Sequence, residues 1–193
     1  MDVIVRKAEQ IPLTDSDIKN ICQNDVLITT YWNFRNMKNT TLMDLFRRST
    51  ALVIFYSTMD ASDGHWSTLI YNPTHNTIEH FDSYGLSLDQ ILAKAEFDRN
   101  RSGGHNFLKE AIQKAVNTYG STFIENRHAF QVTSGLVNTC GRYASVRARF
   151  KDLPLNLFAA MLTNQKIPAD MIVTYMTILF TTNRNALDSL TSK

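Results

Sequence analysis

The sequence predicts an α+β fold with a central mixed β-sheet flanked by helices. Three β-rich runs stand in the middle of the chain, at 51–57, 66–72 and 77–83, and helical patterns come before and after them. Strands and helices do not alternate strictly, as they would in a parallel α/β sheet. The segment 73–76 reads Pro-Thr-His-Asn, which is typical of a hairpin turn, so the second and third runs are expected to be neighbouring strands.

Two helices are expected before the strands. Thr14 is followed three residues later by Asp17, which is the pattern of a helix N-cap and predicts a short helix that ends near Cys22. A second helix is predicted from Asn24 to about Trp32.

The first helices after the strands have clear boundary signals. Ser87 and Gln90 have the spacing of a capping box, which predicts a helix near 88–97. The apolar residues of 107–116 recur with the helical period, and Gly120 is expected to end that helix.

The last part of the chain is expected to hold one strand and three helices. The strand is predicted at 121–126, followed by a loop over 132–138 and a helix that begins at about Cys140. Two further helices near 155–163 and 168–180 complete the predicted fold.

Length and composition favour one compact unit. The chain has 193 residues, of which 44% are apolar, so a single domain over residues 1–193 is expected. The formal net charge of +2 implies no obligatory polyanionic partner.

The two cysteines, Cys22 and Cys140, are far apart and form no CxxC pair. This pattern argues against a disulfide framework or a structural zinc site and favours a reducing compartment. The N-terminus lacks the apolar core of a signal peptide, and the most apolar stretch, 171–180, is about half of the ~20 residues that span a bilayer. A soluble monomer that does not bind membranes is therefore expected.

Cys140 is the candidate nucleophile. It stands at the expected start of a helix, where unpaired amides and the helix dipole stabilise a thiolate. Gly141 carries no side chain that would block a scissile carbonyl, and the Cys140 amide can donate to a developing oxyanion. An isolated cysteine is more often a small buried residue, so the interpretation depends on its companions.

His65 and Asp82 are the expected acid–base pair. His65 precedes the strand 66–72, and Asp82 lies at the end of the next strand, so a hairpin turning at 73–76 brings both to one edge of the sheet. A carboxylate in that position fixes the imidazole tautomer and stabilises the imidazolium. Without His65 nearby in the fold, the segment 82–85 would be interpreted only as a turn.

Gln131 is the candidate donor to the oxyanion, together with the Cys140 amide. It stands nine residues before the cysteine, and a glutamine in such a place is usually only solvated. Gln131 is a candidate only because His65, Asp82 and Cys140 are also present in the sequence.

These residues form ordered motifs: Gly64-His65-Trp66, Phe81-Asp82-Ser83-Tyr84-Gly85, Gln131 and Thr139-Cys140-Gly141-Arg142-Tyr143. The set resembles the adenain and SUMO-protease group of cysteine peptidases. In that group the order is His, then Asp, Glu or Asn, then Gln, then Cys, with Trp after the His and Gly after the Cys. In papain-like enzymes, by contrast, the cysteine precedes the histidine.

The resemblance extends from residue 13, where the N-terminal segment is similar to the Leu-Asn-Asp-x-Ile-Ile segment of SUMO proteases, to about residue 150. One departure is the interval between Gln131 and Cys140, which is longer than is usual for the family. The loop 132–138 must therefore fold back, and Asn138 is a substitute donor.

By resemblance, the chain is expected to be a thiol endopeptidase with the triad His65, Asp82 and Cys140 and without a cofactor. Small size and the Cys-Gly-Arg-Tyr sequence at 140–143 are similar to viral members, including those of large DNA viruses and virophages. The substrates would then be capsid or core precursor proteins in the virion or the infected host cell. Trp66 would wall a narrow cleft that favours cleavage after small residues such as glycine.

Two alternatives stay open. The same triad serves ubiquitin-like-protein deconjugases and, more remotely, acetyltransferases. A non-catalytic capsid or scaffold protein with a relic fold is the alternative from another class, although an intact triad gives such a protein no advantage.

A nucleic-acid or metal site is not favoured by the sequence. Adenovirus protease uses DNA as a cofactor, so the resemblance admits a peptide or DNA activator, but a solvated helix face is the preferred interpretation of the basic run. Its members are Arg142, Arg147, Arg149 and Lys151. The four remaining histidines lack metal-ligand spacing, so no metal is assigned; they are His75, His80, His105 and His128.

Overall fold

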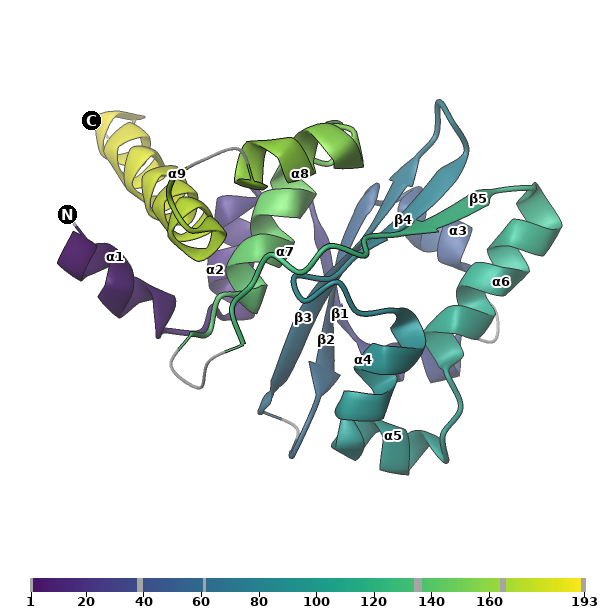
Figure 1. Ribbon diagram of the computed structural model, residues 1–193. Coiled ribbons are helices and arrows are strands. Elements are labelled where there is room, and N and C mark those ends of the chain that lie inside the picture. The colour runs from purple at the N-terminus through teal and green to yellow at the C-terminus, as the bar shows by residue number, and fades with distance from the viewer. Residues whose placement is uncertain (1, 38–39, 61, 134–136, 164–165, 192–193) are drawn as a thin grey trace.

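The computed structural model describes residues 2–37, 40–60, 62–133, 137–163 and 166–191 (Figure 1). Within these ranges the chain forms a five-stranded mixed sheet with helices on both faces, in the order β1-β2-β3-β4-β5. The strands are β1 (Leu27–Thr30), β2 (Ala51–Ser57), β3 (Gly64–Asn72), β4 (Thr77–Phe81) and β5 (Thr122–Glu125). The expected α+β class and the mixed sheet are confirmed.

The sheet is built around an antiparallel centre. Strands β2, β3 and β4 pair antiparallel, and β1 and β5 add to the two edges in parallel with β2 and β4. The turn at 73–76 joins β3 to β4, and Asn76 has a φ of 47°, a left-handed conformation that asparagine tolerates.

The helices fall into two groups, one on each face of the sheet (Figure 1). One face is covered by α1 (Asp2–Glu9), α2 (Asp15–Ile21), α7 (Cys140–Arg149), α8 (Leu155–Thr163) and α9 (Ala169–Thr191). The other is covered by the 3₁₀ helix η1 (Tyr31–Asn36), α3 (Leu42–Phe46), α4 (Leu88–Lys94), α5 (Glu96–Ser102) and α6 (Phe107–Tyr119).

Alternate side chains of β2 pack into two different hydrophobic cores, one on each face of the sheet. Because successive side chains of a strand point to opposite faces, Ala51 and Val53 pack with α2 and α7, whereas Leu52 and Ile54 pack with the cluster beneath η1, α3, α4 and α6. These four side chains are buried, as is typical of a central strand covered on both faces.

Local capping signals correctly identified several helix ends. The capping boxes of Thr14 with Asp17 and of Ser87 with Gln90 are both formed, and Gly120 ends α6 in a left-handed conformation. A third box, in which Thr41 caps α3, forms where no helix was expected.

The helix predicted from Asn24 to about Trp32 is wrong. Gln23 and Asn24 have positive φ values that end α2 in a turn, and the next residues form β1. Strand β1 has the sequence Leu-Ile-Thr-Thr and pairs in parallel with β2, which supplies hydrogen bonds that a helix would forgo. The 3₁₀ helix η1 begins only after this strand.

Other helices also differ from expectation. The helix expected near 88–97 stops at Lys94, and the chain resumes as α5 after Ala95, because Phe97 N donates to Thr58 O and thereby ties α5 to the end of β2. Helix α9 extends beyond the predicted end at 180. Helix α1 had not been predicted. No helix in the described ranges is long and apolar enough to cross a bilayer.

Candidate active site

The β3–β4 hairpin places His65 beside Asp82. His65 is the second residue of β3, one position further inside the sheet than expected, and it pairs with Tyr56 of β2. Asp82 directly follows β4. His65 Nε2 donates a hydrogen bond to Asp82 Oδ2, so the imidazole is held by one nitrogen and its Nδ1 is left for another partner.

Asp82 is fully buried and has several hydrogen-bond donors. Its Oδ1 accepts from the backbone N–H groups of Tyr84 and Leu86, at 2.9 and 3.0 Å. Burial by itself raises the pKa of Asp82, but the charge and hydrogen bond of His65 outweigh it, so the pKa is lowered. The carboxylate is therefore ionised and oriented.

Cys140 is the first residue of α7, and its thiol faces His65. Burial by itself raises the pKa of the Cys140 thiol. The hydrogen bond and charge of His65, together with the backbone N–H groups of Trp66 and Gly141, lower it by more than burial raises it, so the net pKa is lowered. Burial alone would lower the pKa of His65, but Asp82 and then Cys140 raise it to about 10. The arrangement therefore favours a thiolate beside an imidazolium.

Cys22 lies in a contrasting environment. It is buried between α2 and α7, and its thiol donates to Ser145 O at 3.4 Å. Burial raises its pKa to about 12, so of the two thiols only that of Cys140 has surroundings that lower its pKa.

Gln131 lines a cavity of 390 Å³ together with His65 and Cys140. The side chain is buried, and Ser83 Oγ donates to its Oε1 at 2.7 Å. Since Ser83 occupies the oxygen, the Nε2 end of the amide is the donor available to the cavity; its only hydrogen bond in the described part of the chain is a long one, 3.5 Å, to Val137 O.

Asn138, the substitute donor, is engaged elsewhere. It lines the same cavity, but its Nδ2 donates to Gln10 O at 3.0 Å and its backbone N–H donates to Glu9 O at 2.7 Å. The end of α1 thus holds this part of the loop, and Gln131 is the better placed of the two amides.

A second cavity, of 890 Å³, is lined by Trp66, Gly141 and Leu13 among others, and also by Cys140. Trp66 is buried and packs on Phe55, with ring centroids 4.7 Å apart. Cys140 therefore lines both cavities, one shared with His65 and one shared with Trp66.

Gly141 has a packing role that the sequence interpretation did not foresee. A Cβ at this position would lie 3.2 Å from Leu13 Cβ and 3.2 Å from Trp66 Cδ1. The missing side chain therefore lets α7 approach Trp66 closely, in addition to leaving room beside the thiol.

Sequence reasoning missed a buried carboxylate near the site. Asp170, in the first turn of α9, accepts hydrogen bonds from Thr139 Oγ1 and from Val132 N, the latter at 3.0 Å. In the sequence, an aspartate at the start of a helix indicated only a favourable interaction with the helix dipole. No local pattern pointed to these long-range partners.

The expected solvated face at the basic run is wrong for its arginines. Arg147 is 1% exposed and makes a bidentate ion pair with Glu79 of β4, at 2.7 and 2.8 Å. Arg142 is 5% exposed and donates to Thr177 Oγ1 and to Ala8 O. These two side chains join α7 to the sheet, α1 and α9.

The other two cations of the run are also engaged. Arg149 Nη1 donates to Ile21 O at 2.6 Å, and Lys151 Nζ pairs with Asp25 at 2.6 Å. The run therefore fixes α7 in place, which a count of charges along the sequence does not reveal.

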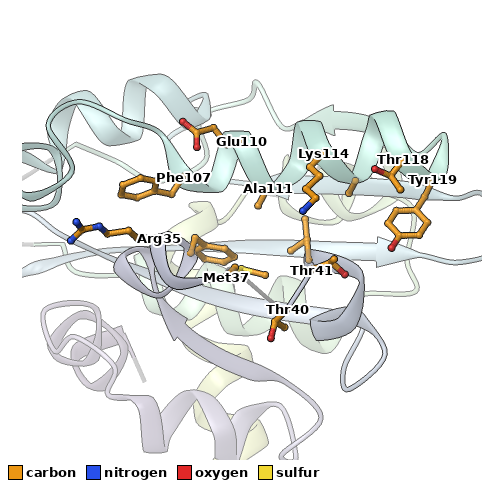
Figure 2. Close-up of a pocket in the computed structure, with 13 residues that line it drawn as sticks. Arg35, Met37, Thr40, Thr41, Phe107, Glu110, Ala111, Lys114, Thr118 and Tyr119 are labelled. Carbon is orange, nitrogen blue, oxygen red and sulfur yellow. The ribbon is translucent and has the colours of Figure 1, made fainter.

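A separate cavity of 370 Å³ lies between η1, α3 and α6 (Figure 2). Figure 2 shows Lys114 of α6 reaching towards Thr41, with Arg35 and Phe107 at the other end. None of the candidate catalytic residues lines this cavity, so it is distinct from the site around Cys140.

Comparison with known proteins identifies the fold. No protein-family model matches the chain. The structure is similar to that of the ASFV pS273R protease, with a TM-score of 0.51 and 12% sequence identity, over 89% of this chain and 68% of that one. The chain therefore shares the fold of this protease. The expected fold is confirmed.

Two further proteins are similar to the chain with this peptidase fold. A solved structure of the SUMO protease Ulp1 has a TM-score of 0.49 and 13% identity, over 92% of this chain and 81% of that one. By sequence, the chain is 26% identical over 174 residues to the uncharacterized protein V9 of Sputnik virophage, covering 88% of this chain and 96% of V9.

Proposed function

We propose that the protein is a cysteine endopeptidase with Cys140 as nucleophile, His65 as general base and acid, and Asp82 as the residue that orients His65. Gln131 and the Cys140 amide donate to the oxyanion. The observation that carries the proposal is the chain of contacts from a buried, ionised carboxylate through His65 to a thiol at a helix N-terminus.

The reaction is acyl transfer in two halves. His65 holds the proton of Cys140, the thiolate attacks the peptide carbonyl, and the oxyanion accepts hydrogen bonds from Gln131 Nε2 and the Cys140 amide. The C–N bond breaks as His65 gives its proton to the leaving amine. Water, deprotonated by His65, then hydrolyses the thioester and restores the thiol.

The cleft supports a substrate that is an extended peptide with small residues before the scissile bond. Trp66 and Gly141 line the cavity beside Cys140, and the indole would form the wall against which the residue before the scissile bond packs. Since His65 must reach the leaving amine, the cavity that it lines would hold the residues after the scissile bond, and the cavity beside Trp66 would hold those before it.

A role in the maturation of virion precursor proteins, in the virion or the infected host cell, is part of this proposal. It is supported by similarity to an ASFV protease and to a virophage protein. Ulp1 and the Chlamydia trachomatis effector Cdu1 have been solved with SMT3 and with ubiquitin, so deconjugation is the second activity to be tested.

The proposal is tested by incubating the purified protein with virion precursor proteins, with glycine-containing fluorogenic peptides, and with fluorogenic ubiquitin and SUMO. Cleavage that is abolished in Cys140→Ala and retained in the matched variant Cys22→Ala is expected. Activity that survives in Cys140→Ala would refute the assignment. Turnover of the ubiquitin-like conjugates alone would favour the deconjugase.

A further inference from the structure

The two proposed oxyanion donors flank the segment 132–139. Gln131 precedes this segment and Cys140 follows it, so their separation depends on what holds its two ends together. Asp170 contacts both: Oδ2 accepts from Val132 N at 3.0 Å, and Oδ1 accepts from Thr139 Oγ1. One carboxylate thus joins the residue after Gln131 to the residue before Cys140.

The Thr139 side chain does not cap α7. Thr139 occupies the N-cap position of α7, where a threonine side chain commonly accepts a hydrogen bond from an amide of the first helical turn. The side chain makes no such bond here, and its hydroxyl donates to Asp170. The first turn of α7 receives no side-chain cap from Thr139, and the Gly141 amide lowers the pKa of the Cys140 thiol.

Burial makes the arrangement specific. Asp170 is 4% exposed and Thr139 is fully buried. If either donor were lost, one buried oxygen of Asp170 would be left without its hydrogen bond, so moving Val132 away from Thr139 carries a free-energy cost. The anchor comes from α9, an element that contributes no group to the triad.

We propose that Asp170 is a positioning residue of the oxyanion site. By binding Val132 N and the Thr139 hydroxyl together, it sets the distance between Gln131 and the Cys140 amide. This inference rests on the proposed peptidase function, and it accounts for how a long interval between the glutamine and the cysteine is accommodated.

The test separates thiolate chemistry from oxyanion stabilisation. Alkylation of Cys140 by iodoacetamide needs the thiolate but develops no oxyanion, whereas peptide hydrolysis and hemithioacetal formation with a peptide aldehyde need both. All three are measured in wild type, Asp170→Asn, and the pair Thr139→Val and Thr139→Ser. Thermal unfolding is recorded for each variant.

In Asp170→Asn and Thr139→Val we expect kcat and aldehyde affinity to fall by roughly 10- to 100-fold, with KM and alkylation rate within about twofold of wild type. Thr139→Ser keeps the hydroxyl, so it should retain most of the kcat.

Unchanged kcat in Asp170→Asn and Thr139→Val would overturn the inference. A parallel loss of alkylation, hydrolysis and thermal stability would also overturn it, because it would assign Asp170 a purely structural role. If wild type itself neither hydrolyses peptides nor binds the aldehyde while Cys140 still alkylates, the proposed function fails and the inference falls with it.

Discussion

Asp82, the residue that directly follows β4, accepts a hydrogen bond from His65 Nε2 near the start of β3. The bond fixes the proton on Nε2 and leaves Nδ1 to exchange a proton with Cys140. Two backbone donors, Tyr84 N and Leu86 N, hold the other carboxylate oxygen and prevent the pair from rotating away. The turn that follows β4 therefore determines the tautomer of His65, because its backbone N–H groups hold Asp82 in place.

Replacing Asp82 by asparagine is predicted to preserve the fold and to lower kcat. The asparagine oxygen would keep the bonds to Tyr84 N and Leu86 N, so its amide group would face His65 Nε2 and force the proton onto Nδ1, where it blocks transfer from the thiol. A fall of roughly 10²- to 10⁴-fold in kcat is expected, with little change in Tm. The exposed Asp89, which lines neither cavity beside Cys140, offers a control in Asp89→Asn; equal rates in the two variants would contradict the tautomer argument.

The pH dependence of Cys140 alkylation is the second prediction. Because the pKa of Cys140 is lowered, iodoacetamide should label it well below the ordinary thiol pKa of about 8.5. The pKa of His65 is raised to about 10, so the imidazolium persists through neutral pH, and peptidase activity should decline as pH rises through that value.

Mass spectrometry of the labelled chain provides an internal control for this experiment. Cys22, with a pKa of about 12 and a buried thiol, should remain unlabelled. In His65→Ala the labelling of Cys140 should shift towards ordinary thiol behaviour. Labelling of both cysteines at similar rates would show that the activated thiol does not exist.

Two glycines beside the site predict different outcomes for the same substitution. A Cβ at Gly64 would lie 2.1 Å from the backbone oxygen of Tyr56, so Gly64→Ala should displace the start of β3 and lower Tm strongly. A Cβ at Gly141 meets only side chains, at 3.2 Å, so Gly141→Ala should fold with a loss of about 1–3 kcal/mol and a reduced kcat/KM as Trp66 shifts. Thermal unfolding and peptide hydrolysis distinguish the two, and a Gly141→Ala protein with the lower Tm would reverse the expected order.

Arg147→Met is predicted to destabilise the protein by about 3–5 kcal/mol, because it leaves Glu79 buried without its bidentate partner. Arg48→Met, at an exposed arginine, should change the free energy of unfolding by less than about 0.5 kcal/mol. Urea unfolding measures both. Adding Glu79→Leu to Arg147→Met should recover part of the loss; failure to recover would place the cost in packing rather than in the unpaired charge.

The sequence was most informative where the governing interactions are local. Capping boxes at Thr14 and Ser87 and the glycine at 120 mark helix ends through contacts within a few residues, and the structure forms them. The run from Leu27 to Thr30 becomes a strand only because β2, more than twenty positions later, pairs with it. The sequence of 27–30 by itself does not indicate that β2 will pair with it.

The same distinction applies to the site. His65 and Asp82 are joined by one hairpin, so their proximity could be inferred from the turn at 73–76. Asp170 lies 31 residues from Thr139 and Arg147 lies 68 residues from Glu79, and neither link has a local signature. Buried charge is therefore the part of the site that the sequence concealed.

The hairpin that joins His65 to Asp82 also suggests an order of folding. His65 and Asp82 are 17 residues apart, so forming their contact costs little loop-closure entropy. The docking of α7 closes a much longer loop, because Arg147 of α7 and Glu79 of β4 are 68 residues apart. The imidazole and its carboxylate would then be assembled while Cys140 is still an ordinary thiol. A chain that folds in this order acquires its reactive sulfur only once α7 has docked, so the proposed peptidase would stay inactive until folding is complete.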